Sequence, residues 1–198
     1  MPRLEFWFDF ASTYSYPAAM RIEKLAQATG VTVDWNAFLL GPLFREQGWN
    51  DSPFNLFAAK GKYMWRDLQR TCAALSIPFV RPSMFPRNGV LAARVACRFA
   101  SEPWIAGFAK AVFHANFGED REIYDPEVVV ACLSGLGLNG QLVLEQAQTT
   151  ESNALLRAQT EKAKSLGIFG APTFLIGEEL FWGNDRLEEA LAWARLHS

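Results

Sequence analysis

The chain has 198 residues, which is enough for one domain with a sizeable core or for one domain that carries a large insertion. With 50% hydrophobic residues, 20% charged residues and a formal net charge of −2, the composition is that of a soluble globular protein and gives no sign of a clustered basic surface that binds nucleic acid. No run approaches the roughly 18 apolar residues of a membrane span, and the N-terminal sequence MPRLEFWFDF lacks the apolar core of a signal peptide, so we expect a cytoplasmic protein without membrane contacts.

The first part of the chain has the pattern of a β-α-β unit. Residues 3–10, RLEFWFDF, are aromatic and partly alternating, which predicts a strand. Residues 15–29 predict a helix with Pro17 in its first turn and Gly30 at its end. Residues 31–38, VTVDWNAF, alternate as a second strand. The helix is long enough to make the crossover between two parallel strands.

The middle of the chain is predicted to be helical. Residues 41–55, GPLFREQGWNDSPFN, form a turn-rich loop, and only helical periodicity follows as far as about residue 165. Breaks that contain proline or glycine separate the predicted helices, which are 56–75, 88–100, 102–116, 126–135, 139–147 and 150–165.

Strand patterns return only near the end of the chain. Residues 172–177, PTFLIG, and residues 180–182, LFW, predict two strands joined by a tight turn. Gly183 ends the second strand, and Asn184 or Asp185 can cap a final helix with the sequence RLEEALAWARL.

A βαβ unit and a ββα unit that share one sheet make the thioredoxin-like arrangement. We therefore predict an α/β protein with a thioredoxin-like fold (βαβ plus ββα) and a large all-helical insertion. Residues 1–42 and 166–198 would form the thioredoxin-like domain, and residues 43–165 would form the helical insertion domain.

Three scattered cysteines, Cys72, Cys97 and Cys132, include no CxxC pair. Their number and spacing argue against a disulfide framework and against a zinc site, so we expect no metal. Each lies in a helix-like apolar pattern, which favours a buried thiol in a reducing compartment.

Ser12 occupies the most informative position, within FDFASTYSYPA at residues 8–18. It follows the first strand, where ligands of α/β sheets bind, and it precedes a helix, whose N-terminus favours negative charge. Capping that helix is the simplest role for a serine at this position. A Ser-His-Asp relay would need His114 or His197, and nothing in the spacing brings either histidine to Ser12. The alternative chemical role is a hydrogen bond to a bound anion such as an external thiolate.

GAPTF at residues 170–174 is the second informative stretch, because it comes directly before a late strand. A thioredoxin-like sheet has a cis-proline here, facing the loop after the first strand, although only about 5% of X-Pro bonds are cis. The backbone of Ala171 would then pair with a short extended peptide. A proline at the start of a strand is the simpler interpretation.

Three stretches together resemble the 2-hydroxychromene-2-carboxylate isomerase family. They are FDFASTYSY at 8–16, GIFGAPTF at 167–174 and FWGNDRLEEAL at 181–191, and the resemblance covers essentially the whole chain. This family lies in the DsbA-like group and is similar to kappa-class glutathione transferases. Redox members of the group carry CxxC where this chain has STYS, with Ser12 and Ser15 at the cysteine positions, which excludes thiol–disulfide exchange at that loop. Many relatives have proline after the serine, where this chain has Thr13.

The resemblance implies glutathione as cofactor and Ser12 as the catalytic residue, with its hydroxyl facing the glutathione sulfur. Ala171 would offer its backbone N–H and C=O to the cysteinyl part, and Pro172 would fix the turn. Asn184 and Asp185 would meet the γ-glutamyl end, where the Asp185 carboxylate suits an α-ammonium group.

Further residues would complete the glutathione site. Asn50, Asn55 and Lys60 lie in and after the long loop, and Lys60 could balance the glycyl carboxylate. Trp182 would line the pocket, with a core tryptophan as the plain alternative.

The insertion is rich in aromatic residues, most of which we expect in the core. Phe85, in RPSMFPRN, is the candidate for contact with a flat aromatic substrate, and the neighbouring Arg87 and Asn88 are candidates for holding its carboxylate.

The implied activity is the interconversion of 2-hydroxychromene-2-carboxylate and trans-o-hydroxybenzylidenepyruvate in aromatic hydrocarbon breakdown. Glutathione thiolate adds to the conjugated carbon, rotation follows, and elimination returns the glutathione, with Ser12 stabilising the thiolate. Relatives are commonly dimers, so a homodimer is expected. Two alternatives stay open: a kappa-type glutathione transferase, which consumes glutathione, and a redox-inactive thioredoxin-like module that binds peptides at the edge formed by Ala171 and Pro172.

Overall fold

A mixed sheet with the strand order β2-β1-β3-β4 organises the computed structural model, which describes residues 2–197. Strands β1 (Arg3–Phe8) and β2 (Thr32–Ala37) run parallel, with Phe8 opposite Ala37. Strand β3 (Thr173–Ile176) is antiparallel to β1, and β4 (Glu179–Trp182) is antiparallel to β3. The predicted βαβ plus ββα arrangement with a helical insertion is confirmed.

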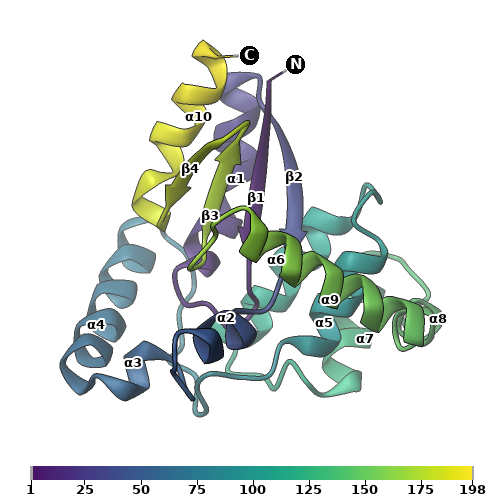
Figure 1. Ribbon diagram of the computed structural model, residues 1–198. Coiled ribbons are helices and arrows are strands. Elements are labelled where there is room, and N and C mark those ends of the chain that lie inside the picture. The colour runs from purple at the N-terminus through teal and green to yellow at the C-terminus, as the bar shows by residue number, and fades with distance from the viewer. Residues whose placement is uncertain (1, 198) are drawn as a thin grey trace.

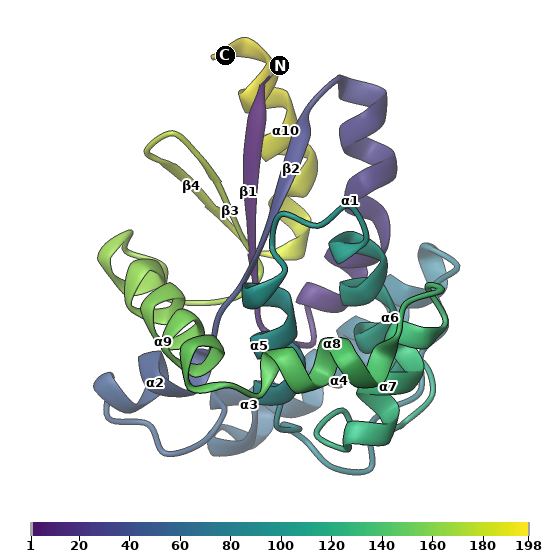
Figure 2. The same ribbon diagram turned by 90° about the vertical axis from the view of Figure 1, so that its right-hand side faces the viewer.

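Helices α1 (Ser15–Thr29) and α10 (Leu187–Leu196) pack side by side against one face of this sheet (Figure 2). The alternation of β1 directs Leu4, Phe6 and Phe8 toward that face, and Trp7 contributes to a separate apolar cluster. Gly30 ends α1 in the left-handed conformation, with φ of 69°, as the sequence predicted.

The helices between β2 and β3 gather mainly around the lower end of the sheet in Figure 1, where the carboxyl ends of β1 and β2 point. Their bounds are α2 (Leu40–Glu46), α3 (Pro53–Leu56), α4 (Ala58–Ala74), α5 (Val90–Arg98), α6 (Ile105–Phe117), α7 (Pro126–Ser134), α8 (Gly140–Ala147) and α9 (Thr150–Ser165). All six predicted helices are present, and each lies within three residues of its predicted bounds, although the first predicted helix is preceded by the short α3. No helix within residues 2–197 is both long and apolar enough to cross a bilayer.

The predicted loop at residues 41–55 was wrong in part, because it contains α2 and the start of α3. Gly41 and Pro42 suggested a turn, yet they lie in the first turn of α2, where backbone N–H groups have no helical partner and a proline costs little. Ser52 begins α3 by accepting a hydrogen bond on its side chain from Phe54 N at 3.3 Å.

The core joins the sheet to the insertion through aromatic rings. The ring of Phe113 in α6 lies 5.7 Å from that of Phe8 and 5.1 Å from that of Phe10, centroid to centroid. These residues belong to one buried cluster that also includes side chains of α1 and α10. The division into residues 1–42 with 166–198 and residues 43–165 stays a prediction, and α2 crosses its first boundary.

The three cysteines are free thiols, and Cys72 and Cys132 are buried as predicted. Cys97 is partly buried, and its Sγ donates to the carbonyl oxygen of Ala37 at 3.3 Å. Burial raises the pKa of Cys72 and Cys132 to about 11 and that of Cys97 to about 12. The thiolate, which is the reactive form, is therefore scarce at neutral pH.

We expect the native protein to react slowly with an aromatic disulfide reagent at about pH 8, where an ordinary cysteine with pKa of about 8.5 reacts readily. The same protein in denaturant should release three equivalents of the coloured thiol rapidly. Rapid modification of even one thiol per native chain would contradict the burial described above.

Candidate active site

Ser12 lies where the loop after β1 meets the loop before β3. Its Oγ donates a hydrogen bond to the carbonyl oxygen of Ala171 at 3.0 Å, across 159 residues of sequence. The same Oγ accepts from the backbone N–H of Ser15, the first residue of α1, at 3.3 Å. The residue is only 8% exposed. The two stretches that the sequence singled out are therefore in direct contact through this hydroxyl.

The interpretation of Ser12 as the helix cap needs correction. The N-cap position of α1 is Tyr14, and no side chain caps it. The Ser12 hydroxyl still accepts a hydrogen bond from the first helical N–H, which leaves its own proton to be donated. An acceptor placed beside it would also lie near the N-terminus of a 15-residue helix, where the dipole favours negative charge.

The Asp9 carboxylate fixes the end of β1. Its Oδ1 accepts from Ala11 N at 2.8 Å and its Oδ2 from Leu40 N at 2.7 Å, while Ser12 N donates to the Asp9 carbonyl oxygen at 2.9 Å. Burial raises the pKa of this carboxyl, against the opposing effect of the two N–H donors. Sequence reasoning missed Asp9, although a charged residue within the apolar run FDF was a signal.

The peptide bond between Ala171 and Pro172 is cis, as predicted. The loop that contains it is held on both sides: Thr173 Oγ1 donates to Gly170 O at 2.9 Å, and Gly183 N donates to Pro172 O at 2.9 Å. The second of these hydrogen bonds links the loop to the turn before α10.

That turn places Asn184 and Asp185 beside the loop, but neither residue caps α10 as predicted. They form a 3-10 turn, and α10 begins at Leu187 without a side-chain cap. Asn184 is nearly buried, and its Oδ1 accepts from Arg21 Nε at 3.2 Å. Asp185 is exposed, and its Oδ1 would lie 2.5 Å from a Cβ added to Gly183, so the carboxylate sits directly over that glycine.

Trp182 is not a core residue, because 53% of it is exposed. It lies opposite Thr173 in the pairing of β3 with β4, next in register to Pro172. Its ring centroid lies 5.0 Å from that of Phe169. This aromatic pair borders the cis-proline loop.

The residues predicted from the long loop lie around α3 and α4. Asn50 and Lys60 are exposed, and Lys60 Nζ lies 4.7 Å from the centroid of the Phe57 ring. Asn55 Nδ2 donates to the Phe85 carbonyl oxygen at 3.1 Å and also contacts the Asp51 carboxylate.

Tyr14 connects these helices to the Ser12 loop. Its hydroxyl donates to Asp67 Oδ2 in α4 at 2.8 Å, and its ring lies 6.3 Å from that of Phe54 in α3. Burial raises the pKa of Tyr14, and the hydrogen bond to Asp67 adds to this, so the phenol stays protonated.

The three predicted substrate residues, Phe85, Arg87 and Asn88, differ in exposure and in their contacts. Phe85 is half-buried and packs edge-on against Trp65, with 4.9 Å between ring centroids. Asn88 Oδ1 accepts from Val90 N at 2.9 Å, at the start of α5. Arg87 is only 5% exposed, and protein groups surround its guanidinium, so its role toward a substrate carboxylate stays a prediction.

Arg81 is an exposed cation beside Trp65, and the sequence analysis did not identify it. Its guanidinium carbon lies 4.9 Å from the centroid of the Trp65 ring, which in turn packs against Phe85. Arg81 and Arg87 both lie beside prolines in the sequence, but Arg81 is exposed and Arg87 is buried.

The two histidines have local contacts. His114 Nε2 lies 3.4 Å from Glu119 Oε1, and His197 Nδ1 lies 3.1 Å from the Trp193 carbonyl oxygen. Within residues 2–197 no group of three His, Cys, Asp or Glu side chains is arranged to hold a metal ion.

Asp120, a partner of Arg87, gives the native state a pH dependence of definite sign. Hydrogen bonds from Ser83 N at 2.8 Å and from Arg87 hold the pKa of Asp120 below its usual range. Such a carboxyl stabilises the fold above the unfolded-state pKa of about 3.9, and this contribution is lost as the pH falls through the lower native pKa.

We therefore expect Asp120→Asn to be less stable than the wild type at neutral pH and to lose less stability on acidification below about pH 4. Denaturant unfolding at a series of pH values measures both effects. Equal loss of stability in the two proteins over the acid range would contradict the assigned shift.

Comparison with known proteins adds a family context to this geometry. A family model described as a DSBA-like thioredoxin domain matches residues 3–192. The 2-hydroxychromene-2-carboxylate isomerase of Pseudomonas putida is 33% identical over 189 residues, which cover 93% of this chain and 90% of that protein. Glutathione S-transferase kappa 1 of Caenorhabditis elegans is 26% identical over 200 residues, with 94% and 88% covered. A solved structure of a 2-hydroxychromene-2-carboxylate isomerase superposes with a TM-score of 0.87 at 30% identity and covers 98% of this chain and 95% of its own.

Proposed function

This chain belongs to the family of DSBA-like thioredoxin domains, as its three motifs predicted, and from that membership we propose that it is a glutathione-dependent isomerase. It would interconvert 2-hydroxychromene-2-carboxylate and trans-o-hydroxybenzylidenepyruvate. The similarity to enzymes named for the first of these compounds supports the substrate. The observation that carries the glutathione dependence is the position of the Ser12 hydroxyl, between the first N–H of α1 and the Ala171 carbonyl.

The residues around Ser12 fit the chemistry of glutathione. Ala171 offers backbone groups to the cysteinyl part, and its loop is held by the hydrogen bond between Gly183 and Pro172. The exposed Asp185 carboxylate suits the α-ammonium group of the γ-glutamyl end, and Arg21 orients the neighbouring Asn184. Trp182 borders the same loop.

Asn50, Asn55 and Lys60 are proposed for the glycyl end. Lys60 supplies the cation, and its exposure leaves the ammonium available to a carboxylate. Asn55 ties this region to the loop that carries Phe85.

When bound, glutathione would supply a thiolate, the nucleophile for a reversible addition to the conjugated carbon of the substrate. Ser12 would donate a hydrogen bond from its hydroxyl to that sulfur and would keep its proton. Phe85 and Trp65 offer aromatic surface to the substrate rings, and Arg81 is the exposed cation beside them for the substrate carboxylate. Asn88 remains a candidate for a polar contact there.

The first test is calorimetric titration of the protein with reduced glutathione, with S-methylglutathione as the control ligand. Saturable binding that prefers the free thiol supports the proposal. The isomerisation is then followed with catalytic amounts of glutathione, and the glutathione is assayed before and after. Failure of folded protein to bind glutathione would remove the proposed function and favour a redox-inactive peptide-binding module.

Recycling separates this proposal from a second candidate, a kappa-type glutathione transferase. The similarity to the Caenorhabditis elegans kappa enzyme favours that candidate as the alternative. A transferase would consume one glutathione per product, whereas the isomerase returns it.

The proposed homodimer and cytoplasmic location rest on the family resemblance and on the reduced cysteines, and sedimentation of the purified protein tests the dimer.

Asp185→Asn is expected to weaken glutathione binding by roughly 10- to 100-fold, because a charge-assisted hydrogen bond to an ammonium contributes roughly 1.5–3 kcal/mol. The affinity for glutathione that lacks its α-amino group should be nearly unchanged by the substitution. Calorimetry with the two ligands measures the difference. Equal weakening of both would show that Asp185 does not contact the ammonium.

A further inference from the structure

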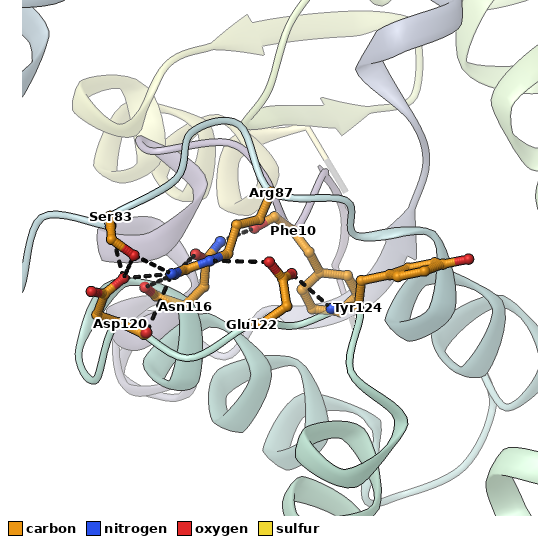
Figure 3. A network of polar contacts seen from close by, with 7 residues as sticks. All are labelled: Phe10, Ser83, Arg87, Asn116, Asp120, Glu122 and Tyr124. Atoms are coloured by element: carbon orange, nitrogen blue, oxygen red, sulfur yellow. Dashed lines mark hydrogen bonds and ion pairs between the residues drawn. The ribbon is translucent and has the colours of Figure 1, made fainter.

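Arg87 is the centre of a buried polar network that joins three distant segments (Figure 3). Its side chain is only 4% exposed. One terminal nitrogen, Nη1, donates to the carbonyl oxygen and to Oδ1 of Asn116, at 3.2 and 3.1 Å. The other, Nη2, donates to Ser83 Oγ at 3.2 Å and to the carbonyl oxygen and Oδ1 of Asp120, at 3.2 and 2.5 Å. Its Nε lies 3.7 Å from Glu122 Oε2. We call these residues the Arg87 network.

Asn116 carries the network to the sheet. It is 1% exposed, and its Nδ2 donates to the carbonyl oxygen of Phe10 at 3.0 Å. Its Oδ1 accepts from Arg87, a donor, whereas its Nδ2 faces a carbonyl, an acceptor. Only one orientation of the amide therefore satisfies both hydrogen bonds. The cation of Arg87 thus fixes which group of Asn116 faces the backbone of Phe10.

Phe10 lies two residues before Ser12, in the segment that sets the position of the Ser12 hydroxyl. Within this segment, Ala11 N donates to the Asp9 carboxylate and Ser12 N donates to the Asp9 carbonyl oxygen. The loop that carries Arg87 also packs closely against this segment, because a Cβ added to Gly89 would lie only 3.0 Å from Phe10 Cβ. The Phe10 carbonyl is therefore one point at which a buried polar group of the insertion contacts the segment before Ser12.

We propose that Arg87 and Asn116 are positioning residues that hold the Phe10 peptide and so align the Ser12 hydroxyl on the glutathione sulfur. This inference rests on the proposed function and deepens it. A buried ion pair is often no more stabilising than apolar side chains of the same size, whereas a planar guanidinium fixes the direction of its partners. Here the direction fixed is that of the Asn116 amide.

The first variant to test this is Asn116→Asp, which keeps the shape of the side chain and its contact with Arg87 but removes the donor to Phe10. Its matched control is Asn139→Asp, the same substitution at the N-cap of α8, where the Oδ1 accepts from Leu142 N and aspartate serves equally well. Arg87→Lys is a second variant, which keeps the charge and loses the planar fork.

We expect kcat to fall by roughly 10- to 100-fold in Asn116→Asp and Arg87→Lys, the scale of losses that follow small displacements in a catalytic site. The KM for glutathione should change little. The pKa of the bound thiol, followed by thiolate absorbance, should rise toward that of free glutathione. Asn139→Asp should match the wild type in all three.

The Ser12→Ala background separates positioning from a general effect of charge. If Asn116 acts through Ser12, Asn116→Asp adds almost nothing once the hydroxyl is gone. An equal rise in the thiol pKa with and without Ser12 would overturn the inference, as would wild-type kcat in both folded single variants.

Amide hydrogen exchange tests the positioning role without an activity assay. Exchange of the Ala11 and Ser12 amides should quicken in Asn116→Asp and stay unchanged in Asn139→Asp. If the wild type binds no glutathione, the proposed function fails, and unchanged exchange in Asn116→Asp would separately overturn the positioning role.

Discussion

Ser12→Ala is expected to lower kcat/KM by about 100- to 1,000-fold, the loss that follows removal of one hydrogen-bond donor from a site of developing negative charge. A free thiol with a pKa of about 8.5 is only a few per cent ionised at neutral pH. Lowering that pKa by about two units takes roughly 2.7 kcal/mol. One hydrogen bond to a charged acceptor supplies roughly 1.5–3 kcal/mol, and the helix N-terminus adds about 0.3–1 kcal/mol. The two together suffice without a histidine.

The matched control is Ser15→Ala, in the same STYS sequence. The Ser15 hydroxyl is buried and has no hydrogen-bond partner within residues 2–197, whereas its backbone N–H, which meets Ser12, is kept. Steady-state rates and the thiol pKa of bound glutathione are measured for both variants, with circular dichroism to verify the fold. Wild-type activity in Ser12→Ala would show that the role assigned to this hydroxyl is wrong.

Phe113→Ala is expected to lower the free energy of unfolding by about 3–5 kcal/mol, as large-to-small changes at fully buried aromatic positions do. Phe113 is fully buried, and its ring contacts those of Phe8 and Phe10 at the end of the sheet. It also lies 6.5 Å from the Tyr16 ring in α1. The substitution therefore opens a cavity where the insertion meets the sheet, and little in such a close-packed region can move to fill it.

Phe57→Ala is the comparison, because Phe57 is 45% exposed and its loss should cost less than about 1 kcal/mol. Urea unfolding followed by far-ultraviolet circular dichroism and by tryptophan fluorescence measures both variants. The shared core also predicts that the two signals change together in a single transition. Two separate transitions in the wild type would mean that the insertion folds independently of the sheet.

Most of the fold could be predicted because its elements have strong local patterns. The strands are short aromatic or alternating runs, and Gly30, Pro126 and similar residues mark helix ends. Helix α2 could not be found in this way, because Gly41 and Pro42 also favour a turn, and only the contacts of the folded chain decide between the two.

At the candidate site, too, the sequence predicted residues in local motifs but not residues whose roles depend on distant contacts. The motifs identified Ser12 and the cis-proline loop, since both depend on fixed positions at the ends of strands. Arg87 and Arg81 have similar sequence surroundings, and their opposite fates depend on Asn116 and Asp120, which lie about 30 residues away in sequence. Contacts over such distances leave no periodic trace in a single sequence.

Under the proposed function, the hydrogen bond from Ser12 to Ala171 would also select among ligands. A newcomer gains the Ser12 proton only by displacing a neutral carbonyl that already accepts it at 3.0 Å. A thioether is too weak an acceptor to win this competition, whereas an anionic sulfur forms a bond roughly twice as strong as a neutral one. The exchange also releases the Ala171 carbonyl to accept from an amide of the same ligand. In the proposed isomerase, recognition of the sulfur charge and recognition of the peptide backbone would thus be a single event.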